Sequence, residues 1–124
     1  MLMEAYAPPG WPDGVRPPGA PDWDAGAVAF LFDCCPADFR SYPVLRRHPL
    51  VLALFAAHFV AGQCRAAQEG LAGVRTSLQG TVSAEVVESA VQAWLEQAAR
   101  LTRTKRAVGL VEDALRGQVF VRRL

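Results

Sequence analysis

Polar side chains interrupt the apolar pattern of the two longest predicted helices at one level. Val, Leu and Ala recur every three or four residues in the last predicted helix, except at Lys105. Antiparallel pairing of 49–79 with 83–116 places Gln63 at that level, with His58 about one turn away. Such residues can bind a small anion, but a polar layer that fixes helix register is the favoured interpretation. The candidate pocket consists of His58, Gln63, Arg103, Thr104 and Lys105.

The histidines and cysteines show no catalytic or metal-binding pattern. His48 and His58 are ten residues apart, so on one helix they diverge by about 80°. Cys34 and Cys35 are adjacent and Cys64 stands alone, whereas a zinc site needs four ligands at wider spacing. We expect the three cysteines to be small apolar residues of the core.

Motifs of the common reaction types are also missing. The sequence has no phosphate-binding loop, no G-x-S-x-G and no H-E-x-x-H segment. The spacing of arginine and histidine found in helical-hairpin ribonucleases is not present either. We therefore expect no catalytic residue, no cofactor and no metal, and a protein that is not an enzyme.

Basic residues gather before the first long helix and after the second. They are Arg40, Arg46 and Arg47, and Arg116, Arg122 and Arg123. An antiparallel hairpin is expected to bring both groups to one end, where a phosphate backbone could bind. Pairing with the acidic residues of 1–39 is the simpler interpretation. Since no aromatic platform accompanies the arginines, nucleic acid is the less favoured partner.

Length and composition indicate a single soluble domain. The chain has 124 residues, of which 52% are hydrophobic and 20% charged, and its net charge is +1. An odd cysteine count and an N-terminal segment unlike a secretion signal predict a reduced, cytoplasmic protein. The most apolar segment, 49–62, is shorter than a bilayer-spanning helix, so we expect a buried core helix and no membrane contact.

The predicted fold is all-α. A short helix over 22–35 has Asp22 as its candidate N-cap, and two short turns follow in 36–47. A long helix begins at Pro49 and another begins after Ser83. Gly117 is expected to end the second long helix, and Gly70 and Gly73 weaken the first enough for a kink or break. The closing segment QVFVRRL is expected to pack as an extended tail.

The two long helices predict an antiparallel hairpin with arms about 45–50 Å long. The short helix spans about 20 Å, so it can cover only one half, which we expect to be 49–64 and 101–115. The other half, 66–98, then exposes an apolar stripe, which is rare on a monomer. We expect a homodimer that forms a four-helix bundle, or an unknown protein partner. The candidate interface consists of Leu71, Val74, Val87, Val91, Trp94 and Leu95.

A repeated motif, PPGWPD and then PPGAPD, marks residues 1–21 as a Pro-rich extended arm beside a helical domain at 22–124. The arm is expected to cross the bundle and to lay Trp11 on its surface. Trp23 is expected on the same bundle surface, where Asp13 and Asp22 could meet arginines. A polyproline ligand for another protein is the alternative.

Three segments, RPPGAPDW (16–23), RRHPLVLA (46–53) and RAVGLVEDALRG (106–117), resemble a family of small helical proteins from high-GC actinobacteria. The resemblance extends over nearly the whole chain. It implies a helical, cytoplasmic protein and assigns no functional residue. Together these features predict a non-catalytic interaction or structural module that self-associates through its hairpin. The alternatives are a nucleic-acid-binding accessory protein that uses the arginine-rich end and a small-anion binder.

Overall fold

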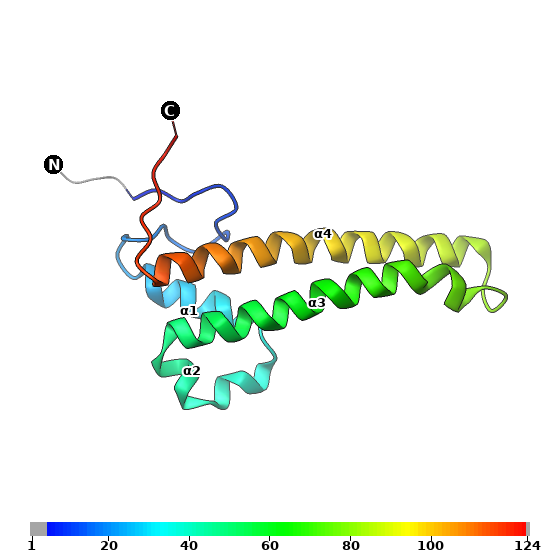
Figure 1. Ribbon diagram of the computed structural model, residues 1–124, viewed down its shortest axis with the longest axis horizontal. Helices are drawn as coiled ribbons and strands as arrows, with labels where there is room; N and C mark the ends of the chain where they lie inside the picture. The colour runs from blue at the N-terminus through cyan, green and yellow to red at the C-terminus, as the bar shows by residue number, and fades with distance from the viewer. Residues whose placement is uncertain (1–4, 124) are drawn as a thin grey trace.

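Residues 5–123 are described by the computed structural model, and they form helices and connecting segments without any strand. The predicted all-α hairpin is confirmed: two long antiparallel helices pack along their length, and a shorter helix covers one half (Figure 1). The elements are α1 (Trp23–Asp33), a 3-10 helix η1 (Ala37–Ser41), α2 (Pro43–Arg47), α3 (Pro49–Leu78) and α4 (Ala84–Leu115).

The helix ends follow local sequence signals in most places. Pro49 occupies the first turn of α3, where a missing backbone N–H costs nothing. The hydroxyl of Ser83 accepts a hydrogen bond of 3.3 Å from the backbone N–H of Val86, which caps α4. Gly117, at φ 94°, lets the chain turn away after α4. Asp22 differs from the prediction: it precedes α1 at φ 60°, and its side chain makes no capping bond.

Helix α3 is continuous through Gly70 and Gly73, so the break that these glycines would allow does not occur. Its pairing with α4 continues over both glycines and stabilises the helical backbone there. The helix extends well beyond the apolar segment 49–62: it is 30 residues long and contains an 18-residue window of mean hydropathy 1.5. By length and composition it could cross a membrane, and 28% of that window is buried within the protein.

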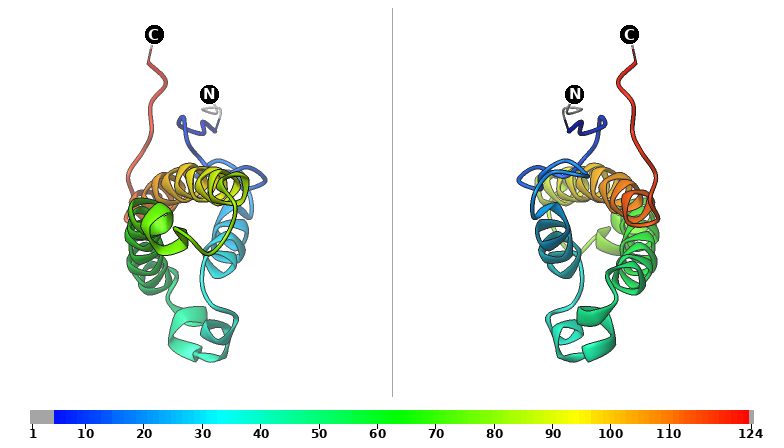
Figure 2. Two further views of the ribbon diagram at one scale, coloured as in Figure 1. Left: turned by 90° about the vertical axis from the view of Figure 1, so that its right-hand side faces the viewer. Right: turned by 90° about the vertical axis from the view of Figure 1, so that its left-hand side faces the viewer.

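The core lies where α1 packs against α3 and α4 (Figure 2). Seen end-on, α1 flanks the hairpin on one side, and η1 and α2 lie below α3. The fully buried large side chains, all at or below 1% exposure, come from α1, α2, α3 and α4. They are Leu31, Leu45, Leu52, Val60, Val108 and Val111. We call this covered part the proximal half of the hairpin.

The repeated Pro-Pro-Gly motif forms two β-turns. The amide of Trp11 bonds to the carbonyl of Pro8, and the amide of Ala20 to that of Pro17, both at 3.0 Å. The glycine of each motif has a positive φ, 93° at Gly10 and 87° in the second turn, as the third position of a type II turn requires. The arm is therefore shortened by turns and is not one continuous polyproline stretch.

The arm docks on the proximal half, as predicted. Trp11 is 9% exposed and belongs to the core cluster, where it contacts Trp23 and Phe120 with ring centroids 6.2 Å apart. The guanidinium of Arg106 donates two hydrogen bonds, of 3.0 and 3.2 Å, to the carbonyl of Pro9. The expected pairing of the arm's aspartates with arginines does not occur within 5–123; a backbone carbonyl takes that role.

Candidate functional site

The half of the hairpin beyond α1, which we call the distal half, has a narrow seam of its own. Val74 and Val91 are buried between α3 and α4, at 7% and 8% exposure. Leu71, Val87 and Trp94 are half-buried, and Leu95 is exposed. The six predicted interface residues therefore divide into a buried pair that holds the hairpin together and four that reach its surface.

Gly70 provides the space for the Trp94 ring. A Cβ built on Gly70 would lie 2.3 Å from Cζ2 of Trp94 and 2.4 Å from its Cε2, so only glycine admits the ring here. By contrast, a Cβ on Gly73 would meet nothing closer than the Ser77 hydroxyl at 3.9 Å. The two glycines thus differ: Gly70 forms the seat of the indole, while Gly73 leaves an open surface beside it.

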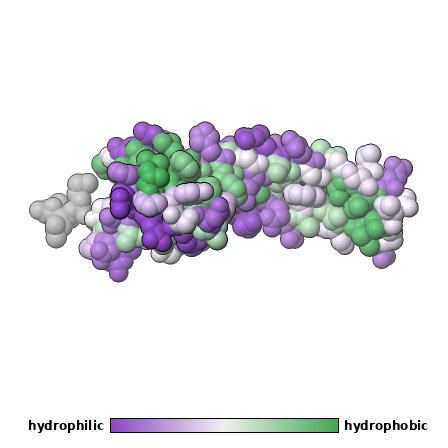
Figure 3. All heavy atoms as spheres, turned by 90° about the horizontal axis from the view of Figure 1, so that it is seen from below, coloured by the Kyte–Doolittle hydropathy of each residue, from purple (hydrophilic) through white to green (hydrophobic). Residues whose placement is uncertain are grey.

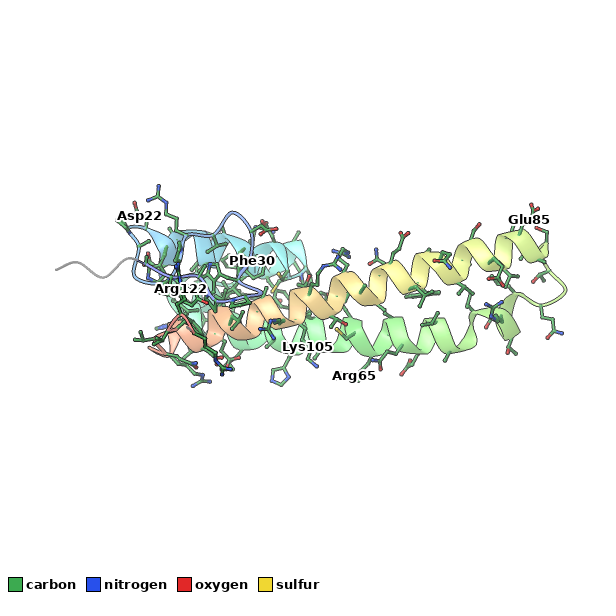
Figure 4. The ribbon with its side chains drawn as sticks, turned by 90° about the horizontal axis from the view of Figure 1, so that it is seen from above. Asp22, Phe30, Arg65, Glu85, Lys105 and Arg122 are labelled. Carbon is green, nitrogen blue, oxygen red and sulfur yellow. The ribbon has the colours of Figure 1, made fainter. Side chains whose placement is uncertain are left out.

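The face of the hairpin that packs against α1 continues, uncovered, beyond the end of α1. Under the end of α1, Gln63 of α3 and Thr104 of α4 line a cavity of about 470 Å³ together with Phe30 and Cys34. Figure 4 shows α1 alongside only part of the hairpin, with Phe30 on the side that faces α4. Beyond that point, steps of three and four residues along each helix continue the same face.

The first such position on α4 is Arg100, which lines the cavity and donates a hydrogen bond to Gln97. Beyond Arg100 the continuing positions are small or uncharged, and we call them the distal face. They are Ala66, Gly70, Gly73 and Ser77 on α3, and Val86, Ala90, Ala93 and Gln97 on α4. Small residues allow another helix to approach closely, and the half-buried Trp94 ring lies among them at Gly70. The sequence prediction missed this face because it followed large apolar residues, although the regular spacing of Gly and Ala was readable.

The opposite side of the distal half is polar. Arg75 of α3 and Glu88 of α4 form a two-pronged ion pair across the hairpin. Their hydrogen bonding lowers the pKa of the Glu88 carboxyl and raises that of Arg75. Both side chains are more than half exposed, so the pair contributes little to stability but keeps this side hydrated. Leu95, 44% exposed, also belongs to this side by its spacing.

The candidate anion pocket is not assembled as one site. Gln63 and Thr104 line the same cavity, whereas Arg103 lines a neighbouring one beside Trp11. His58 and Lys105 are exposed, and Figure 4 places Lys105 on the side of α4 away from α1. No polar or charged side chain is buried within residues 5–123, so the seam contains no buried polar layer.

The two groups of arginines lie at the same end of the hairpin but on opposite sides of it. Figure 1 shows η1 and α2 below α3, and the C-terminal segment rising above α4. Arg40 pairs with Asp33 at 2.7 Å, and Arg116 with Glu112 at 3.0 Å. Arg122 lies over the ring of Tyr6. The elements that carry Arg40, Arg46 and Arg47 therefore lie on the other side of the hairpin from the C-terminal segment that carries Arg122 and Arg123.

The cysteines lie in and around the core, as expected. Cys35 is buried, and Cys34 and Cys64 are half-buried against the core cluster. Burial, followed by the neighbouring Cys35 and Asp33, raises the pKa of the Cys34 thiol to about 11. The pKa of Cys35 is also raised by burial. Residues 5–123 contain no cluster of three or more His, Cys, Asp or Glu side chains able to hold a metal ion.

Comparisons with known proteins do not assign this chain to a family. The chain matches no protein-family model, and no curated protein or solved structure is significantly similar to it. The resemblance to actinobacterial helical proteins therefore stays a prediction.

Proposed function

We propose that this protein is a non-catalytic structural or interaction module that self-associates through the distal face of its hairpin. Two copies would pack their distal halves together as a four-helix bundle. A helix of each copy would cover the distal face of the other, in the way that α1 covers the proximal half of its own chain. Alternation of small residues with the Trp94 ring suits such packing, because close backbones and one large aromatic anchor stabilise helix contacts.

The amount of exposed surface carries this proposal. The chain exposes 8492 Å². A compact folded monomer of 13.4 kDa exposes about 6,500 Å². The excess is about 2,000 Å², and a stable interface buries roughly 800 Å² per partner. Two distal halves can therefore supply an interface of ordinary size without any change in the fold.

Molar mass in solution tests the proposal. We expect light scattering to give twice the chain mass of 13.4 kDa at micromolar concentration. Ala93→Glu introduces a charge on the distal face and is expected to raise the dimer dissociation constant at least about tenfold, since an unpaired charge would be desolvated. Ala99→Glu makes the same change in the same helix, on its other side, and is the matched control.

The control should remain a dimer, and circular dichroism should show equal helix content in both variants. A wild-type chain that stays monomeric, or two variants that dissociate equally, would overturn self-association through this face.

A further inference from the structure

Aromatic residues cluster at the proximal end, away from the distal face. Phe39 of η1 lies at the centre, with ring centroids of Tyr42, Phe55 and Phe59 between 5.9 and 6.2 Å from its own. All three contacts are edge-on, a favourable geometry for aromatic pairs. The cluster joins η1 to the side of α3 that α4 does not cover.

This cluster is unusually exposed for its size. Tyr42 is 48% exposed and Phe55 44%, and two aliphatic neighbours in sequence, Val44 and Leu54, are 50% and 37% exposed. Leu54 and Phe55 belong to α3, the helix that contains an 18-residue window of mean hydropathy 1.5, only 28% of which is buried. We call Tyr42, Val44, Leu54 and Phe55 the proximal apolar surface.

Positive charge accompanies the proximal apolar surface. The segment 39–68 contains four arginines and no acidic residue. Arg46 and Arg47, both exposed on α2, take part in no ion pair within residues 5–123. Figure 3 views the molecule from below, the side on which η1 and α2 lie, and shows hydrophobic and strongly hydrophilic residues side by side over this end.

We propose that the proximal apolar surface binds the surface of a lipid bilayer that carries anionic headgroups. Aromatic and aliphatic side chains inserted at the headgroup level and arginines facing lipid phosphates are the two components of interfacial binding. A nucleic acid would satisfy Arg46 and Arg47 but would leave Leu54 and Val44 in water. The contact is peripheral, since α3 stays packed against α4 along its length.

Vesicle sedimentation with the full chain tests this inference. We expect the protein to sediment with vesicles of phosphatidylcholine and phosphatidylglycerol, and to remain in the supernatant with phosphatidylcholine alone. Phe55→Asp should weaken partitioning at least about tenfold, because an inserted aromatic side chain is lost. The double variant Arg46→Glu/Arg47→Glu should lose a similar factor, since each arginine near an anionic surface contributes about fivefold.

Leu95→Asp is the matched control, because Leu95 and Phe55 are equally exposed, at 44%, on opposite halves of the hairpin. It should bind vesicles like the wild type, and thermal melts should show that all variants are folded. Failure of the wild type to sediment with anionic vesicles at low salt would overturn the inference. Equal loss in Leu95→Asp would also overturn it, as would binding to DNA that survives Phe55→Asp without any vesicle binding. Because these residues lie outside the distal face, the outcome is independent of self-association.

Discussion

The proximal and distal halves of the hairpin are made from the same two helices but are covered differently. In the proximal half, α1 and α2 pack on α3, the N-terminal arm packs on α1 and α4, and Leu52 and Val60 are fully buried. In the distal half, α3 and α4 have only each other. Apart from the small Ala67 at 1% exposure, their best-buried residues, Val74 and Val91, keep 7–8% exposure. One pair of helices thus supplies both a core and a projecting rod.

This difference shows how a short chain can use one part of a helix pair for its own core and leave another part available for association. Large side chains facing α1 are buried by the chain itself and stabilise the fold, because each removes apolar surface from water. Where the cover ends, the same face changes to Gly and Ala, which contribute little burial but permit close approach. The size of the side chains on this face, more than their hydrophobicity, distinguishes the proximal half, which forms the core, from the distal half, which is available to a partner.

A matched pair of substitutions on α3 tests the largest consequence. Val60→Ala should lower the free energy of unfolding by about 2 kcal/mol, because it leaves a cavity that rigid neighbours cannot fill. Val74→Ala should cost about 1 kcal/mol, since this seam is open to solvent on both sides and water can fill the space. Urea denaturation at one protein concentration measures both values. Equal losses would contradict the contrast in cover, and unchanged helix content before denaturation is the control.

The glycines of α3 sharpen the comparison within the distal half. At protein concentrations low enough to keep the chain monomeric, Gly73→Ala should stabilise it by up to about 1 kcal/mol, because alanine favours the helix and its Cβ meets no close neighbour within the chain. Gly70→Ala should instead destabilise it by about 1 kcal/mol, because the methyl group displaces the Trp94 ring. Thermal melts measure the stabilities. Tryptophan emission should shift to the red only in Gly70→Ala, and equal stabilisation by both substitutions would exclude the proposed indole seat.

Most of the fold was predictable because local signals and helical periodicity agree. Pro49, Ser83 and Gly117 mark helix ends through capping chemistry that needs no tertiary contact. The continuity of α3 through Gly70 was not predictable from helix propensity, because the compensating contact comes from α4. The turns of the arm were not predicted for another reason. Consecutive prolines favour extended backbone, but each Pro-Pro-Gly motif also fits a type II turn.

The candidate site was predictable only in outline. An uncovered distal half follows from the helix lengths alone, and Trp94 was correctly placed within it. The side that faces outward depends on where α1 ends, which periodicity does not give. The predicted polar level failed for a similar reason: pairing by height ignores rotation, and Lys105 points away from the seam while Gln63 faces the cavity under α1.

The smallest expected effect concerns the cover over Cys34. Burial raises the pKa of its thiol to about 11, so the folded state holds this proton more tightly than the unfolded state. The resulting stability is complete below the unfolded pKa near 9 and is lost as the pH rises toward 11. Because the thiol is only half-buried, solvent screening limits the loss to up to about 1 kcal/mol.

Urea denaturation between pH 8 and 11, compared with Cys34→Ala, measures this contribution of the thiol to the free energy of unfolding. The wild type should lose stability more steeply than the variant over that range, while the remaining slope includes Cys35, whose pKa is also raised by burial. Parallel curves would mean that water reaches Cys34 in the folded protein. The proximal half would then be less well covered by α1 than its contrast with the distal half requires. A steeper loss of stability in the wild type would instead show that the pKa of Cys34 is raised by burial under α1, a cover that the distal half lacks.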